Sequence, residues 1–154
     1  MTGSIEARIA ELGIALPAAA APAANYVPFI RSGNLLFTAG QLPLRDGGLI
    51  ATGTVGGGLD VAAGQDAARQ CAINILAQAK AALGNLDSVA RIVKITVFVA
   101  SAPGFTEQHL VANGASDLLA ELFGAAGKHA RSAVGVASLP LDAPVEVEAV
   151  IECK

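Results

Sequence analysis

The sequence predicts a two-layer α+β domain in which a mixed sheet of five or six strands carries two long helices on one face. Its 154 residues fit a single domain. Helix-like and strand-like patterns follow one another in the order strand, strand, helix, strand, helix, strand, strand. Apolar residues make up 53% of the chain and charged residues only 15%, which is more apolar surface than a small domain can bury alone. We therefore expect a homo-oligomer that covers the open face of the sheet.

The N-terminal part is predicted to be a short amphipathic helix over residues 5–12 and an extended connector over residues 16–24. Pro17 and Pro22 in the connector resist helix formation. A hairpin follows, because two apolar strands flank the turn-forming trio of residues 32–34.

The middle of the chain is predicted to hold two long helices, over residues 62–83 and 106–123. In the first helix, apolar residues recur at three- and four-residue spacing. Asp60 suits the N-cap of this helix, and Gly84 suits the position after its last turn. The glycine-rich segment 46–60, before the helix, is expected to be loop with one weak strand.

Three further strands are predicted over residues 92–100, 131–138 and 145–152, where β-branched residues are frequent. In the last of them, apolar residues alternate with Glu146 and Glu148. Side chains two apart in a strand project from the same face, so both carboxylates should share the face opposite the core.

The composition argues against nucleic acid and membrane as partners. The net charge is −3 and no Lys/Arg cluster is present, so the electrostatic footprint of a nucleic-acid-binding protein is missing. No apolar run reaches the roughly 20 residues of a membrane-spanning helix. Glu6 and Glu11 stand where a signal peptide needs positive charge, and we expect a cytoplasmic protein with Cys71 and Cys153 reduced.

Several chemically suggestive residues have simpler interpretations. The glycines of residues 53–58 lack the lysine of a phosphate-binding loop, and we expect a flexible turn. His109 and His129 are too few for a metal site and are expected on an exposed helix and in a loop, respectively. Cys71 lies on the core stripe of its helix, without a base beside it in sequence. No metal and no cofactor are predicted.

Arg131 and the carboxylates of the last strand are the main candidates for chemistry. Two carboxylates on a sheet face that meets a partner are costly unless they are paired or functional. The sequence leaves two interpretations open: a solvated or salt-bridged edge, with Arg131 or Lys94 as partner, or a functional site. Asn113, in the middle of a predicted helix, is either an exposed residue or part of such a site.

Three segments of the chain together resemble a known family. The first is APAANYVPFIRSGNLLFTAGQLP at residues 21–43, with its G-N and T-x-G-Q-x-P elements. The second is ITVFVA at residues 95–100, before the helix that carries Asn113. The third is ARSAVGVASLPLDAPVEVEA at residues 130–149, with R-S-x-V-x-V-x-x-L-P followed by V-E-V-E. They resemble the Rid family, also called YjgF or endoribonuclease L-PSP, over residues 20–154, and residues 1–19 resemble the N-terminal extension of a longer-chain subgroup.

The resemblance implies a fold, an assembly and an activity. The fold is similar to chorismate mutase, and three subunits pack their sheets into a central barrel with clefts between subunits. Active members of the family hydrolyse short 2-imino and 2-enamino acids to 2-keto acids and ammonia, without a cofactor, and so remove reactive intermediates. The implied partners are a small-molecule carboxylate and two further copies of the chain, with no nucleic acid and no membrane.

The family's site residues map onto this sequence one by one. Arg131 corresponds to the arginine that grips the substrate carboxylate with its planar fork. Glu146 corresponds to the glutamate that holds the attacking water, as a general base. Gly40 and Ala133 correspond to positions where the backbone meets the ligand, and Asn113 to an asparagine that lines the cleft.

Two positions depart from the family pattern. Phe29 stands at a substrate-binding position where a tyrosine is common, and Ala39 stands where a serine is common. Each change removes one hydrogen bond, worth about 1 kcal/mol. A trimer that binds a 2-keto acid without catalysis, in a regulatory role, therefore stays open as an alternative. Endoribonuclease activity, a third reading, is disfavoured by the acidic charge.

Overall fold

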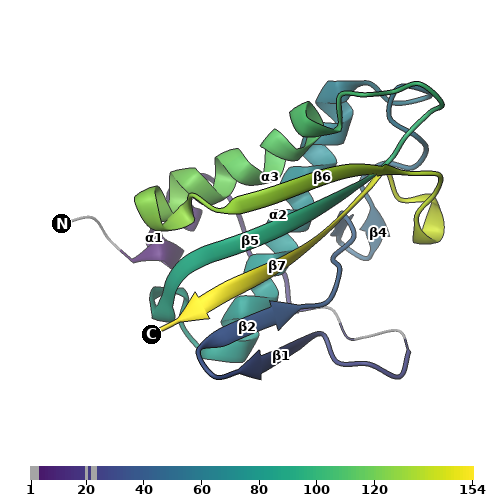
Figure 1. Cartoon of the computed structure of the whole chain (residues 1–154). Coiled ribbons are helices and arrows are strands. Elements are labelled where there is room, and N and C mark those ends of the chain that lie inside the picture. Colours follow the sequence, from purple (N-terminus) through teal and green to yellow (C-terminus); the bar gives the residue numbers. More distant parts are fainter. Residues whose placement is uncertain (1–3, 20, 22–23) are drawn as a thin grey trace.

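The computed structural model describes residues 4–19, 21 and 24–154, and a twisted sheet dominates it (Figure 1). The sheet has five strands in the order β1–β2–β7–β5–β6. Only β5 and β6 pair in parallel; the other neighbours are antiparallel. The strand bounds are β1 Phe29–Ser32, β2 Leu35–Thr38, β5 Val89–Ala100, β6 Ala130–Val136 and β7 Val145–Cys153. The predicted mixed sheet and the predicted element order are therefore confirmed.

Two long helices, α2 (Val61–Leu83) and α3 (Gln108–Phe123), lie against one face of the sheet (Figure 1). Asp60 caps α2, because its carboxylate accepts the Ala63 N–H at 2.8 Å. Gly84 ends α2 at φ +79°, a conformation that a residue without Cβ adopts at no steric cost. Both predicted ends of this helix are confirmed.

The core lies between the helices and the sheet. Alternate residues of β7 point into it and are buried, as predicted: Val145, Val147, Ala149 and Ile151. The apolar stripe of α2 packs onto them, with Cys71, Ile75 and Leu76 at most 1% exposed. Complete burial of each large side chain stabilises the fold by about 1.5–3 kcal/mol.

The short helix α1 (Ile5–Glu11) is fastened to the rest of the domain. The Arg8 guanidinium donates to the Leu122 carbonyl at 2.7 Å, and Glu6 accepts the Leu86 N–H at 3.0 Å. Residues 14–19 then run without helix or strand. Pro22, part of the predicted connector, lies outside the described residues, and the boundary between residues 19 and 20 stays a prediction.

The remaining differences from the predicted bounds are local. The glycine-rich segment contributes β4 (Gly48–Leu49), which pairs with β3 (Leu44–Arg45). Strand β5 begins three residues before the predicted start, because register shifts near Val89 and Ile92 break the alternation that marks a strand. Strand β6 ends at Val136, and 3-10 helices occupy Leu86–Ser88, Gly124–Gly127 and Pro140–Asp142.

The face of the sheet away from the helices, here called the open face, carries exposed apolar side chains. Ile30, Phe37 and Val134 are 60%, 39% and 43% exposed. Ile30 and Phe37 are cross-strand neighbours in β1 and β2, so their side chains share this face. In the described part of the chain, no helix has both the length and the apolar character needed to cross a membrane.

Candidate functional site

Arg131 lies on the edge strand β6, on the side of the sheet that the helices cover. It pairs with the buried Ile95, so its side chain points towards α3. Its Nη1 donates to Asn113 Oδ1 at 2.9 Å and to Ser116 Oγ at 3.0 Å. Its Nη2 donates to the His109 carbonyl at 3.1 Å. All three acceptors are neutral, so the positive charge of the guanidinium is available to a ligand.

A second row of hydrogen bonds supports this arginine. Ser116 Oγ lies 2.9 Å from His129 Nε2, and His129 Nδ1 lies 2.6 Å from the Gly127 carbonyl. His129 lies in a loop, as predicted, but its pairing with Ser116 was not expected from the sequence. The spacing does place Ser116 near Asn113, because it follows Asn113 by three residues and so shares its helix face.

Glu146 lies on the open face of β7, paired with Phe98 of β5. Gly40 packs directly against it: a Cβ at this position would overlap a Glu146 carboxylate oxygen. Glycine at position 40 thus leaves the space that the carboxylate occupies. Within the described residues, the Glu146 carboxylate forms no hydrogen bond or ion pair.

The electrostatic setting makes Glu146 a stronger base than an ordinary glutamate. Burial, and secondly the charge of Glu148, raise the pKa of its carboxyl group. Burial, and secondly the charge of Glu146, raise the pKa of the Cys71 thiol well above its usual value. Cys71 is therefore a protonated core thiol, and Cys153 is likewise buried and free of a disulfide.

The other predicted site residues divide between two regions. Ala133 follows Arg131 by two residues and shares its face, and Asn113 contacts Arg131 directly. Gly40 contacts the Glu146 region. Phe29 sits on β1, at the edge of the sheet opposite β6, where it packs against the core. We call Arg131, Asn113 and Ala133 the arginine half-site, and Glu146 with Gly40 the glutamate half-site.

The two half-sites do not meet within one chain. Strand β5 separates β6 from β7, which places the backbones of Arg131 and Glu146 roughly 10 Å apart across the strands. Their partners Ile95 and Phe98 lie three residues apart on β5, which adds roughly 10 Å along the strands. Their side chains also project from opposite faces, since Arg131 pairs with Ile95 and Glu146 with Phe98. A small ligand bound to one chain therefore contacts only one of these two residues.

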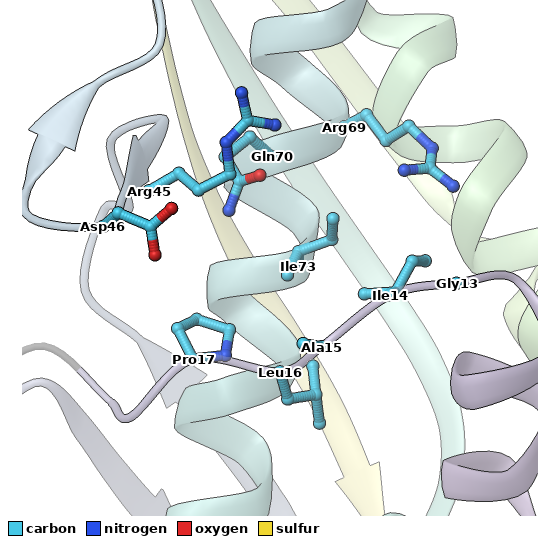
Figure 2. A pocket seen from close by; sticks show the side chains of 10 residues that line it. All are labelled: Gly13, Ile14, Ala15, Leu16, Pro17, Arg45, Asp46, Arg69, Gln70 and Ile73. Carbon is cyan, nitrogen blue, oxygen red and sulfur yellow. The ribbon is translucent and has the colours of Figure 1, made fainter.

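A separate hollow of about 500 Å³ lies between residues 13–17, the β3–β4 hairpin and α2 (Figure 2). Arg45, Arg69 and Ile73 are among its lining side chains. It contains no residue of either half-site, so the candidate chemistry is not located there. Among the described residues, no group of three or more His, Cys, Asp or Glu side chains could hold a metal ion.

The two-layer α+β fold is the arrangement that the sequence resemblance implied, and it carries an arginine on the edge strand and a glutamate on the open face. Residues 17–153 match the family model described as Endoribonuclease L-PSP. The chain belongs to this family, and the resemblance inferred from its sequence is confirmed.

Relatives extend over nearly the whole chain. Protein TCP17 of Trypanosoma cruzi is 55% identical over 152 residues, covering 98% of this chain and 95% of that protein. The crystal structure of Atu1372 from Agrobacterium tumefaciens, of unknown function, is 56% identical with a TM-score of 0.92, covering 97% and 92% of the two chains. Escherichia coli TdcF with bound serine is 28% identical with a TM-score of 0.66, covering 88% and 94%.

Proposed function

We propose that this protein hydrolyses short 2-imino and 2-enamino acids to 2-keto acids and ammonia, in clefts between copies of the chain. The observation that carries the proposal is the division of the site. One face presents a guanidinium bonded only to neutral groups, and the other presents a carboxylate with a raised pKa. The guanidinium offers a binding site for a carboxylate, and the Glu146 carboxylate offers a base. They can act on one substrate only if two copies of the chain bring them together.

The proposed assembly is a homotrimer whose sheets pack into a central barrel. The exposed Ile30, Phe37 and Val134 of the open face support it, because a partner's sheet would remove their apolar surface from water. The same packing places the open face, with Glu146, against a neighbouring subunit. The composition supports the same conclusion, since a 53% apolar chain exceeds what one small domain buries.

In the proposed site, Arg131 binds the substrate carboxylate. A guanidinium has five N–H donors, and three of those of Arg131 are taken by Asn113, Ser116 and His109. The two that remain, on Nε and Nη2, match the two oxygens of a carboxylate. The backbone of Ala133 and the amide of Asn113 line the same region. TdcF, whose crystal structure contains serine, supports an amino-acid-like ligand for this family.

Glu146 acts as the general base. A 2-enamino acid first tautomerises to the imine. A water held by the Glu146 carboxylate attacks C2 of the protonated imine while Glu146 takes a proton from the water; the C–O bond forms, the C=N π electrons move to nitrogen, and a carbinolamine results. The proton then passes from Glu146 to the amine, the C–N bond breaks as the carbinolamine oxygen forms the C=O double bond, and the hydroxyl proton returns to Glu146, so that ammonia and the 2-keto acid leave. General-base catalysis of this kind contributes about 10²–10⁴-fold. Gly40 keeps the space beside the carboxylate open, and the reaction uses no metal or cofactor.

An imine-trapping assay tests the activity. Threonine dehydratase with threonine generates the imino acid, and semicarbazide traps what has not been hydrolysed. The purified protein should lower the trapped fraction in proportion to its concentration, and Arg131→Ala should abolish the effect. No activity on any short imino acid would contradict the proposal.

The second candidate is a trimer that binds 2-keto acids in a regulatory role. Phe29 favours it, because phenylalanine offers a ligand no hydroxyl and packs against the core instead. Pyruvate binding without turnover in the assay above would establish this function. In either case we propose a cytoplasmic protein.

A further inference from the structure

We infer that Ser116 and His129 are positioning residues that set the orientation of the Arg131 guanidinium. The inference rests on the proposed function, since it assigns their role at the carboxylate-binding end of that site. Neither residue needs to touch the substrate. Both act through the hydrogen bonds that join Arg131 to Ser116, Ser116 to His129 and His129 to the Gly127 carbonyl.

With a neutral His129 imidazole, the chain of hydrogen bonds has one consistent direction. The Gly127 carbonyl can only accept, so His129 Nδ1 carries the hydrogen and donates it over 2.6 Å. In the neutral imidazole, Nε2 is then an acceptor and takes the Ser116 hydroxyl hydrogen. The Ser116 oxygen is left to accept from Arg131 Nη1. Each group thus determines the role of the next, from the backbone to the guanidinium.

The far end of the chain is anchored on α3. Gly127 is buried, and a Cβ there would overlap the carbonyl of Leu119. The turn over Gly124–Gly127 therefore packs directly on the helix that also carries Asn113 and Ser116. Because Ser116 and the Gly127 carbonyl belong to the same packed unit, the chain holds Arg131 in place rather than following it.

The hydrogen bonds determine which nitrogens of the Arg131 guanidinium can bind the ligand. Asn113 and Ser116 occupy both hydrogens of Nη1, so this nitrogen cannot turn to the substrate. The carboxylate must bind through Nε and Nη2, in one register. Without the Ser116 oxygen, Nη1 has a free hydrogen, and a half-exposed arginine on an edge strand can rotate away from the cleft.

The test compares Ser116→Ala, His129→Ala and Ser116→Thr with the control Asp117→Ala, an exposed neighbour on the same helix. Pyruvate affinity is measured by calorimetry, and KM and kcat by the imine assay, on the full-length assembled protein. The two alanine variants should weaken pyruvate binding and raise KM about tenfold, with kcat changed less than threefold. Ser116→Thr, which keeps the hydroxyl, should restore most of the affinity, and the control should match the wild type.

A double-mutant cycle separates positioning from general destabilisation. In an Arg131→Ala background, Ser116→Ala should have no further effect on pyruvate affinity, because its action passes through the missing guanidinium. Unchanged pyruvate affinity in Ser116→Ala, or an equal loss with Arg131 present and absent, would overturn the inference. Since affinity is measured without turnover, an inactive wild type would refute the deaminase proposal while leaving this test intact.

Discussion

The ionisable residues on the two faces of the sheet differ in their hydrogen-bond partners. On the helix-covered face, Arg131 is held by neutral acceptors from α3 and by the Ser116–His129 pair behind them. On the open face, Glu146 has no polar partner in the described part of the chain, and its pKa is raised. The contacts of the arginine are therefore complete within one chain, whereas those of the glutamate are not. This difference supports the proposed site between copies of the chain.

Arg131→Ala should have the largest effect. It removes both remaining fork donors and leaves the acceptors on Asn113 and Ser116 unpaired, so pyruvate affinity and kcat/KM should each fall by at least about 100-fold. Arg131→Lys should recover only a small part, because a point charge does not reproduce the planar fork. Calorimetry and the imine assay measure the two losses, and light scattering checks that the proposed trimer is retained. Wild-type affinity in Arg131→Ala would exclude the arginine half-site.

Glu146→Gln should act mainly on turnover. The amide keeps the size of the side chain but cannot accept the proton, so kcat should fall about 100-fold. Pyruvate affinity should persist or rise slightly, since a negative charge near the bound carboxylate is gone. Full activity in a trimeric Glu146→Gln would assign the water to another group, with Glu148 the first to examine.

Gly40→Ala should have an intermediate effect. The added methyl overlaps the Glu146 carboxylate and must displace it, so kcat should fall about tenfold while pyruvate binding at Arg131 changes little. Gly48→Ala is the matched control, because nothing lies within 4 Å of a Cβ at that glycine. Equal activities of the two variants would show that the carboxylate tolerates displacement.

The smallest expected effect is a pH-dependent change in the unfolding temperature of Glu146→Gln. A carboxyl whose folded-state pKa is raised favours folding below its ordinary pKa, and this contribution is lost as pH rises through the raised value. Glu146→Gln should therefore unfold at a slightly higher temperature than the wild type at neutral pH, and the advantage should vanish in acid. Thermal unfolding curves at both pH values measure it. The opposite pH trend would contradict the raised pKa.

The sequence was informative wherever a local pattern determines the structure. Alternation in residues 145–152 predicted correctly that Glu146 and Glu148 leave the core, and Asp60 and Gly84 predicted the ends of α2. The Arg131–Asn113 contact depends on how α3 lies against β6, which no local pattern encodes. The motif resemblance grouped these residues but did not give their contact.

The spacing of Asn113 and Ser116 could place Ser116 at the site, but its pairing with His129 could not be predicted, for the same physical reason. A hydroxyl and an imidazole thirteen residues apart have many conceivable partners, and only the tertiary packing selects one. The separation of Arg131 from Glu146 was also missed. It follows from strand order and register, both of which are long-range properties.

The most direct test of the divided site is complementation between two inactive variants. Arg131→Ala and Glu146→Gln are co-expressed with different tags, and trimers that contain both are purified and assayed for imine hydrolysis. If each cleft takes its arginine from one copy and its glutamate from the next, every mixed trimer regains one intact cleft, which is about a third of its clefts. We predict activity near that fraction of the wild type. Mixed trimers as inactive as the two parents would show that Arg131 and Glu146 act from the same chain, or not together at all.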